Sequence, residues 1–221
     1  PGTATPEAWG WRHGRNYVEL IIVDEAERLR PAALELLRDR YDRDDIALIL
    51  IGMPGCGKST LGRRLAGALH RSFVDADTYL EEKEGKSIPE LFAVSEDCFR
   101  DAEERTIEAL AKRESLVIAS GGGVVNRAVN IERLKKTGTI YFIDRRPEDI
   151  AGDVEVSTRP LLAEGSAKVY TLYHERITLY REAADEIVVN EGSLESVLKK
   201  LLAEVTDGVR PLLVKVYTPK R

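Results

Sequence analysis

Short apolar segments alternate with longer amphipathic segments along most of the chain. Runs such as 18–23, 46–51 and 139–143 contain mostly branched or aromatic residues and predict buried strands. Between such runs, apolar residues recur every three or four positions, which predicts helices. Strands that alternate with helices are typical of a parallel sheet covered on both faces, so we expect an α/β fold of three layers.

The pattern predicts each element from its own residues. Expected strands are 18–23, 46–51, a segment that ends in "FVDAD" (73–77), 116–120, 139–143 and 186–190, and the tail after 205 alternates like a further strand. Expected helices are 31–40, 58–69, 78–84, 88–93, 96–112, 126–136, 146–151, 169–183 and 193–205. The polar stretch 152–168 has no such periodicity and predicts a mobile loop.

Composition narrows the class of protein. The chain has 221 residues, of which 43% are hydrophobic and 32% charged, as in ordinary globular domains. The formal net charge of −5 argues against a nucleic-acid partner. Two cysteines without metal-like spacing indicate a reducing compartment. Neither a bilayer-spanning run nor a signal peptide is recognisable, so we expect a cytoplasmic protein without a membrane partner.

The sequence "GMPGCGKS", Gly52–Ser59, fits a phosphate-binding loop and lies between a predicted strand and a predicted helix. Its glycines allow backbone N–H groups to converge on nucleotide phosphates. Lys58 would add positive charge near the β- and γ-phosphates, and the Ser59 hydroxyl would face Mg²⁺. The alternative is a glycine turn without function, but motif and context together favour binding of ATP or GTP.

Asp75 and Asp77 follow the predicted strand that ends in "FVDAD". Parallel sheets bind ligands at this end of their strands. Two acids spaced by two on an extended segment would share one face. One could then support a metal while the other accepts a proton from a hydroxyl group. The alternative is a turn followed by a helix cap.

Three further features carry arginines or glycines. Arg100 lies on a predicted helix among acids and, taken alone, predicts a surface ion pair. Gly121–Gly123 follow a buried strand and allow close approach of the backbone to a small ligand; the alternative is a strand-to-helix turn, but three glycines in a row are more than a turn needs. Arg159 lies in the polar loop, where an arginine on a closing lid could stabilise a transferring phosphoryl group, and Arg176 follows on a helix.

Taken in order, these features resemble shikimate kinase, a member of the nucleoside-monophosphate-kinase-like group of P-loop NTPase folds. The resemblance covers about residues 46–205 and rests on "GCGKSTLGRRLA", "FVDAD" followed by "GKSI", "FR-x-x-E", "GGG" and "RPLL". It implies an ATP-dependent phosphotransferase that converts shikimate to shikimate 3-phosphate in the chorismate pathway, with ATP and Mg²⁺ as cofactors.

The resemblance also implies roles for single residues. Lys58, Asp77 and Arg159 would be catalytic, with Asp77 binding the shikimate ring hydroxyls and acting as base. Ser59 would bind Mg²⁺, and Asp75 would support the ion through water. The ATP phosphates would be held by Gly55, Cys56, Gly57, Lys58, Ser59, Thr60 and, on lid closure, Arg159. The substrate would be held by Asp77, Arg100, Gly121, Gly122, Gly123 and Arg176, with the two arginines on its carboxylate.

One stretch departs from the family pattern. The family often carries a basic residue just ahead of the lid, near the adenine, whereas "IAGDVEVST" (150–158) has neither Arg nor Lys. We therefore expect altered nucleotide affinity or base preference.

The residues ahead of the kinase-like region are similar to a different family. The segment of about 17–55, with Asp24 and Glu25 after an apolar run, resembles the acid-bearing strand of AAA-type ATPases, particularly transposition-accessory ones. The phosphate loop of such proteins precedes this segment, and here it does not. We hypothesise a chimera with an arm and added strand–helix unit (1–45), a kinase domain (46–205, lid about 152–167) and a tail (206–221).

The added strand could disturb the kinase sheet. We expect the sheet to stay intact, with strand 18–23 at an edge or exchanged between chains, which predicts a monomer or a strand-exchanged dimer. Other functions stay open: an ATPase or nucleotide switch derived from the AAA fragment, a chimera that binds ATP with impaired or no kinase activity, and another small-molecule kinase of the same group.

Overall fold

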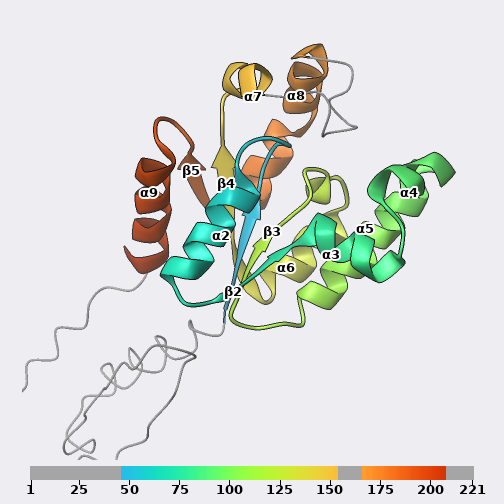
Figure 1. Cartoon of the computed structure of the whole chain (residues 1–221), viewed down its shortest axis with the longest axis horizontal. Coiled ribbons are helices and arrows are strands. Elements are labelled where there is room, and N and C mark those ends of the chain that lie inside the picture. Colours follow the sequence, from blue (N-terminus) through green and yellow to red (C-terminus); the bar gives the residue numbers. More distant parts are fainter. Residues whose placement is uncertain (1–45, 154–165, 208–221) are drawn as a thin grey trace, which may run out of the picture.

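The computed structural model describes residues 46–153 and 166–207, and these contain a parallel five-stranded sheet between two layers of helices (Figure 1). The strands are β1 (Ala47–Ile51), β2 (Ser72–Asp75), β3 (Leu116–Ala119), β4 (Gly138–Asp144) and β5 (Glu186–Val189). The helices are α2 (Lys58–Ala68), α3 (Ala76–Glu84), α4 (Ile88–Val94), α5 (Glu96–Leu110), α6 (Ala128–Lys135), α7 (Pro147–Asp153), α8 (Ser166–Ala183) and α9 (Leu194–Asp207), with a 3₁₀ turn η3 (Val124–Asn126).

Strand β1 is the centre of the sheet, whose order is β2-β3-β1-β4-β5. All five of its residues are apolar and buried, as expected for a strand covered on both faces. It pairs in parallel with β3 on one side and with β4 on the other. The prediction of an intact kinase sheet is therefore confirmed. The predicted strand 18–23, on which the strand-exchanged dimer depends, lies outside the described residues.

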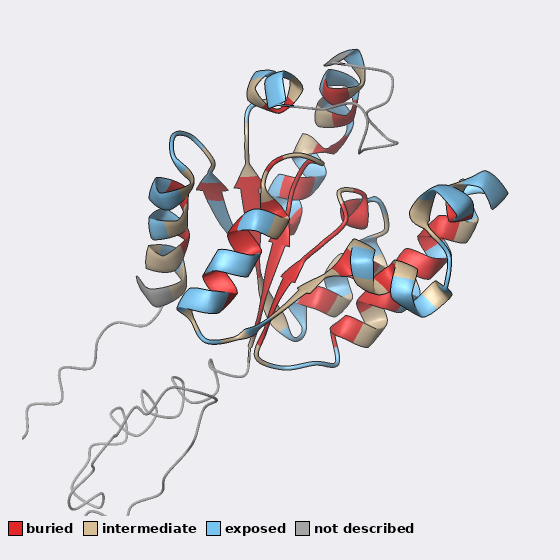
Figure 2. Cartoon of the chain, viewed as in Figure 1, coloured by how far each residue is buried: buried red, intermediate tan, exposed pale blue. Residues whose placement is uncertain are grey.

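Helices cover both faces of the sheet. Helices α2 and α9 pack together on one face, while α6 and α8 contact β4 on the other, next to α5 (Figure 1). Figure 2 shows the resulting core as buried strands with buried helix faces turned toward them. The carboxyl ends of all five strands point to the same edge, so loops that follow different strands meet there.

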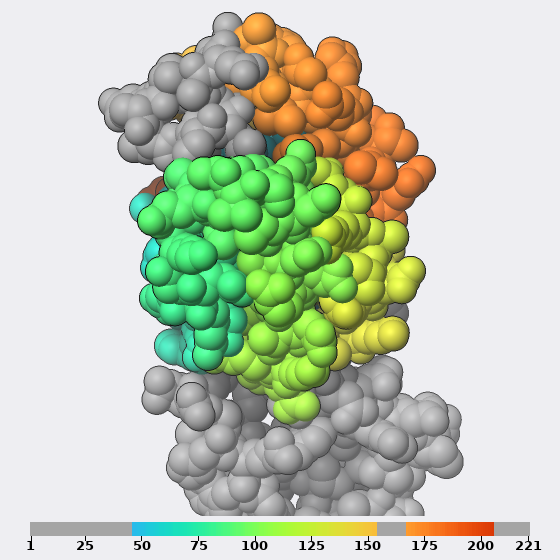
Figure 3. Space-filling model, turned by 90° about the vertical axis from the view of Figure 1, so that its right-hand side faces the viewer, coloured from blue at the N-terminus to red at the C-terminus, as the bar shows by residue number. Residues whose placement is uncertain are grey.

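Helices α3, α4 and α5 form a smaller unit beside the sheet. Figure 3 shows the surface of α4 and α5 facing the viewer, bordered by α6 and α8. A second apolar cluster holds the unit together, and within it the rings of Phe92 and Phe99 stack with centroids 4.3 Å apart. Ser87 and Glu90 form a capping box at the start of α4, and Ser95 caps α5. These caps fix the helix that carries Arg100.

Most predicted elements of the described ranges are present, with three differences. Helix α3 begins at Ala76 rather than at 78, because the Asp75 side chain caps it. The helix expected over 126–136 is divided into η3 and α6. The predicted loop 152–168 is wrong at its ends, since 152–153 complete α7 and 166–168 begin α8. The N-terminal unit, Arg159 and the predicted tail strand lie outside the described residues. No helix within the described ranges is long and apolar enough to cross a membrane.

Candidate active site

The phosphate loop connects β1 to α2 at the carboxyl edge of the sheet. Gly52, Gly55 and Gly57 have φ angles of 143°, 88° and 97°, which side chains rarely tolerate. The buried Lys58 Nζ turns back into the loop and donates to the carbonyl oxygens of Gly52 and Met53, both at 2.9 Å. The loop therefore surrounds a positive charge, as the sequence predicts.

Ser59 and Asp75 lie together next to the loop. The Ser59 hydroxyl donates to Asp75 Oδ2 at 2.6 Å, while Asp75 Oδ1 accepts the N–H groups of Asp77 and Thr78 at the start of α3. The prediction that both acids occupy an extended segment is wrong, because Asp77 is already in the first turn of a helix. Asp75 thus caps α3 with one oxygen, as the alternative interpretation predicts, and with the other oxygen it contacts Ser59.

Asp77 faces the glycine triplet. A Cβ built on Gly121 would lie 2.6 Å from Asp77 Oδ1, so the carboxylate packs directly against that glycine. Burial and then the nearby charge of Asp75 raise the pKa of Asp77 to about 6, although the charge of Lys58 lowers it. A carboxylate with such a pKa is a better proton acceptor than one with an ordinary pKa and is still ionised near neutral pH.

Arg100 is buried, so its interpretation as a surface ion pair is wrong. Its side chain is 7% exposed, and Nη1 donates to Glu103 Oε2 at 2.9 Å within α5. Nη2 and Nε also reach Glu96 Oε1, whose side chain is 68% exposed. Burial raises the pKa of Glu103, although Arg100 lowers it. Glu103 is the buried partner that orients this guanidinium, with Glu96 as a second, exposed partner.

Arg176 approaches the same place from α8. Its Nη1 donates to the carbonyl oxygen of Gly122 at 3.2 Å, and the hydroxyl of the fully buried Tyr180 donates to the same oxygen. Arg176 Nε and Glu103 Oε1 are buried without a hydrogen-bond partner among the described residues. Buried polar atoms of this kind are rare in native proteins and point to a polar ligand.

The glycine triplet leaves no room for side chains. A Cβ on Gly122 would lie 2.7 Å from the Pro54 ring, and one on Gly123 would lie 2.1 Å from Arg100 Nη1. The backbone of the triplet thus separates the phosphate loop from the two arginines. Its three positions need glycine for space, which a simple strand-to-helix turn does not require.

These groups form one site at the carboxyl edge of the sheet. Its charged members beyond the loop are two guanidinium groups, Arg100 and Arg176, and two carboxylates, Glu103 and Asp77. Two guanidinium groups favour an anionic ligand held between them, with a reactive group near Asp77. Of the predicted residues, Thr60 is exposed in the first turn of α2, and Arg159 lies outside the described residues.

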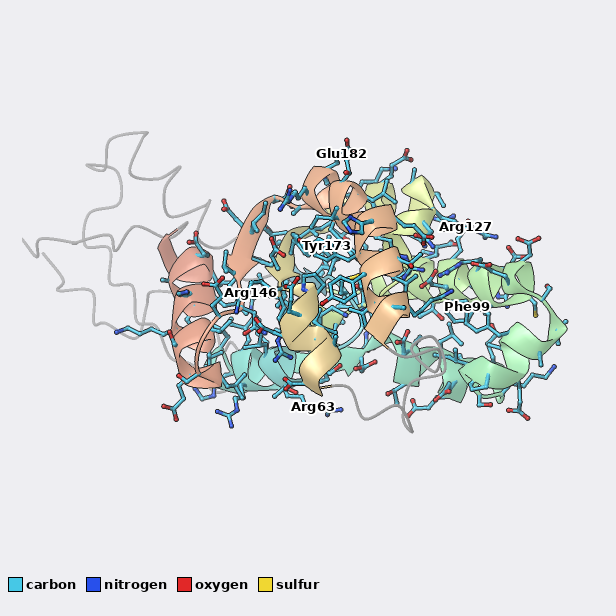
Figure 4. All side chains as sticks on the ribbon, turned by 90° about the horizontal axis from the view of Figure 1, so that it is seen from above. Arg63, Phe99, Arg127, Arg146, Tyr173 and Glu182 are labelled. Carbon is cyan, nitrogen blue, oxygen red and sulfur yellow. The ribbon has the colours of Figure 1, made fainter. Side chains whose placement is uncertain are left out.

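A cavity of about 430 Å³ also borders Arg100. It is lined by Ser95, Glu96, Asp97, Arg100, Asn126 and Arg127. Arg127, labelled in Figure 4, is ion-paired there with Asp101 and Glu104. The cavity shares Arg100 with the site described above, but none of its lining residues belongs to the phosphate loop, the glycine triplet or α8.

Sequence reasoning assigned no role to four residues that the structure places at the site. Glu103 follows Arg100 by three positions on a helix, a spacing that predicts an ion pair. Arg145 and Asn190 each follow a strand at the ligand-binding edge, which is a general signal for such residues. Tyr180 is one helical turn beyond Arg176, but its partner on Gly122 could not be read from the sequence.

A glycine loop between the central strand and a helix, with acids and arginines at the same edge, defines a P-loop NTPase fold of the small-molecule kinase class. The chain belongs to the shikimate kinase family, whose family model matches residues 54–206. A second family model, described as AAA domain, matches residues 8–56, in agreement with the predicted N-terminal resemblance.

Known relatives cover most of the kinase-like region. A shikimate kinase of Clostridium botulinum (strain Alaska E43 / Type E3) is 46% identical over 154 residues, which are 70% of this chain and 93% of the relative. One of Clostridium beijerinckii is 45% identical over 162 residues, 73% and 96% of the respective chains. The solved shikimate kinase of Acinetobacter baumannii, in complex with shikimate, has a TM-score of 0.71 at 32% identity and covers 77% of this chain and 98% of its own.

Proposed function

We propose that the chain phosphorylates shikimate to shikimate 3-phosphate at the expense of ATP. The observation that carries the proposal is the placement of two buried arginines, Arg100 and Arg176, beside Asp77 and across the glycine triplet from the phosphate loop. Shikimate is a small carboxylate with ring hydroxyl groups, so its carboxylate matches the two arginines and its hydroxyl groups match the proton acceptor. The similarity to a shikimate kinase solved with shikimate supports this acceptor.

We assign to these residues the roles that the family resemblance implies, and the charges and contacts of the described residues support them. Arg100 and Arg176 bind the carboxylate, and Gly121–Gly123 present backbone to the ring. The hydroxyl oxygen of shikimate attacks the γ-phosphorus of ATP, and Asp77 accepts the proton of that hydroxyl. As the new O–P bond forms, the bond between the γ-phosphorus and the oxygen that leaves with ADP breaks. Lys58, with Gly55–Thr60, holds the phosphates, and we assign the lid arginine, Arg159, to the same phosphates.

We assign Mg²⁺ to Ser59 and Asp75. A hydroxyl and a carboxylate oxygen are the hard donors that this ion prefers, and the two side chains are already in contact. The described residues contain no cluster of three His, Cys, Asp or Glu suited to a metal. Bound there with ATP, the ion would neutralise phosphate charge.

The compartment that fits this function is the cytoplasm. Both cysteines are free, and Cys56 is buried within the phosphate loop, where a thiol is best preserved under reducing conditions. Mass analysis of shikimate after incubation with the full chain, ATP and Mg²⁺ tests the proposed reaction. A product heavier than shikimate by one phosphoryl group is expected.

Gly123→Ala is expected to raise the KM for shikimate at least tenfold, because the new Cβ would lie 2.1 Å from Arg100 Nη1 and displace the guanidinium. The KM for ATP should change less than twofold, since Gly123 does not face the phosphate loop. Steady-state kinetics with each substrate varied in turn measures both. Gly67→Ala is the matched control, because nothing lies within 4 Å of its Cβ position. If Gly123→Ala leaves the KM for shikimate unchanged, Arg100 does not bind shikimate.

A further inference from the structure

The carbonyl side of the phosphate loop is held by two side chains from distant strands. Arg145, directly after β4, donates from Nη1 to the carbonyl oxygen of Gly55 at 3.1 Å. Asn190, directly after β5, donates from Nδ2 to the carbonyl oxygen of Cys56 at 2.7 Å. We call Arg145 and Asn190 the carbonyl brace. We propose that the carbonyl brace positions the phosphate loop for nucleotide binding, an inference that rests on the proposed function.

The sheet explains why these two residues meet the loop. Strand β1 pairs with β4 so that Ile51 lies opposite Phe142, and β4 pairs with β5 so that Asp144 lies opposite Val189. The residues that follow β4 and β5 therefore lie beyond the carboxyl end of β1, next to the phosphate loop. The Asn190 N–H also donates to the Asp144 carbonyl at 2.8 Å, which fixes its backbone.

The guanidinium of Arg145 is fixed on its other side as well. Its Nη2 forms an ion pair with Asp153, the last residue of α7, and the Arg145 side chain is 21% exposed. A planar guanidinium held by two acceptors has little freedom, so its hydrogen bond to Gly55 is pre-organised. The neighbouring Arg146, labelled in Figure 4, instead pairs with Asp149 at the surface and is 64% exposed.

The effect of the carbonyl brace on the loop follows from peptide geometry. In a trans peptide the C=O and the next N–H point in opposite directions. Holding the carbonyls of Gly55 and Cys56 outward therefore turns the N–H groups of Cys56 and Gly57 toward the inside of the loop. The Cys56 N–H does meet the Met53 carbonyl there, at 3.1 Å, close to where Lys58 Nζ binds that same oxygen.

This arrangement divides the loop into two sides. Side-chain donors take the carbonyl oxygens of Gly55 and Cys56, while the Cys56 N–H and the Lys58 ammonium meet at the Met53 carbonyl inside the loop. An anion is stabilised by converging N–H groups only if these are held in place before it arrives. Asn190 adds a second constraint, because its Nδ2 lies 3.2 Å from the Cβ position of Gly57, the residue that directly precedes α2. Changes in the carbonyl brace should thus alter the affinity for the nucleotide and leave the affinity for shikimate unchanged.

Titration calorimetry of the full chain with MgADP and, separately, with shikimate tests the inference. Arg145→Ala and Asn190→Ala are each expected to raise the Kd for ADP about tenfold, which corresponds to about 1.4 kcal/mol. The Kd for shikimate should stay within twofold. Asn190→Asp should weaken ADP binding more than Asn190→Ala does, because the aspartate places a carboxylate oxygen against the carbonyl oxygen of Cys56. Arg145→Lys should recover part of the affinity, and Arg146→Ala is the matched control with unchanged affinity.

The opposite results separate two failures. If both alanine variants bind ADP with the affinity of the unchanged chain, the carbonyl brace has no positioning role. The same holds if their affinities for shikimate and for ADP fall equally. Lys58→Ala distinguishes this outcome from failure of the proposed function. A variant Lys58→Ala with weakened ADP binding, beside unaffected carbonyl-brace variants, would overturn the inference alone. Unchanged ADP affinity in Lys58→Ala as well would overturn the nucleotide site and the inference with it.

Discussion

Asp77→Asn is expected to lower kcat for shikimate phosphorylation by about 10²–10⁴-fold, the range typical of a lost general base. The amide has nearly the same shape as the carboxylate and can keep the contact with Gly121, but it cannot accept the proton of the attacking hydroxyl. The Kd for ADP should change little, because Asp77 contacts no residue of the phosphate loop through a hydrogen bond in the described structure. Steady-state kinetics and ADP titration of the same preparation measure both.

Stability distinguishes this loss from unfolding. Burial raises the pKa of Asp77 to about 6, so above that pH the fold holds a carboxylate that would be better solvated in the unfolded chain. Removing the charge at pH 7.5 should therefore leave the unfolding temperature equal or higher. Glu82→Gln, at an exposed position on the same helix, is the matched control for charge removal. Retention of more than a tenth of kcat by Asp77→Asn would exclude Asp77 as the base.

Arg100→Lys is expected to lower kcat/KM for shikimate about 10- to 100-fold, mainly through KM. The lysine keeps a positive charge near Glu103 but loses the planar fork that can bind a carboxylate with two parallel hydrogen bonds. A charged hydrogen bond contributes about 1.5–3 kcal/mol, which is the basis of the expected range. The KM for ATP should change less than threefold. Initial-rate kinetics with shikimate varied at saturating ATP gives the comparison.

Arg100→Ala should cause a larger loss and also destabilise the fold by about 3 kcal/mol, because Glu103 would remain buried without its partner. Urea unfolding separates that stability effect from the effect on shikimate. Arg105→Lys is a suitable control on the same helix, since its ion pair with Glu84 is exposed. If neither change at Arg100 alters the KM for shikimate, the carboxylate binds elsewhere, and the cavity beside Arg127 becomes the place to examine.

The central sheet could be predicted because each of its strands is set by local pattern. Strand β1 is a continuous apolar run followed by a glycine loop, and β3 is a similar run followed by three glycines. Where a single side chain determines the first residue of a helix, the pattern of apolar and polar residues does not predict that residue. Asp75 begins α3 two residues earlier than predicted because its carboxylate accepts two backbone N–H groups, a contact that depends on its rotamer.

The candidate site was predicted where a motif fixes residue type and spacing, and missed where contacts come from distant parts of the chain. Lys58 and Ser59 lie where the loop motif places them. The burial of Arg100 depends on the packing of α5 next to the glycine triplet, which helix periodicity does not reveal. Arg145 reaches Gly55 across 90 positions and Asn190 reaches Cys56 across 134 positions. Both contacts depend on the order of the strands in the sheet, which the sequence pattern alone does not give.

The most direct test of the account is ADP formation by the full chain, with ATP and Mg²⁺, measured with and without shikimate. We expect ADP formation that depends on shikimate, saturates with it and yields one shikimate 3-phosphate for each ADP. When shikimate is omitted, we expect only a small fraction of that rate. Hydrolysis of ATP at an equal rate without shikimate, or ATP binding with no turnover in either condition, would contradict the assignment of this chain as an active shikimate kinase.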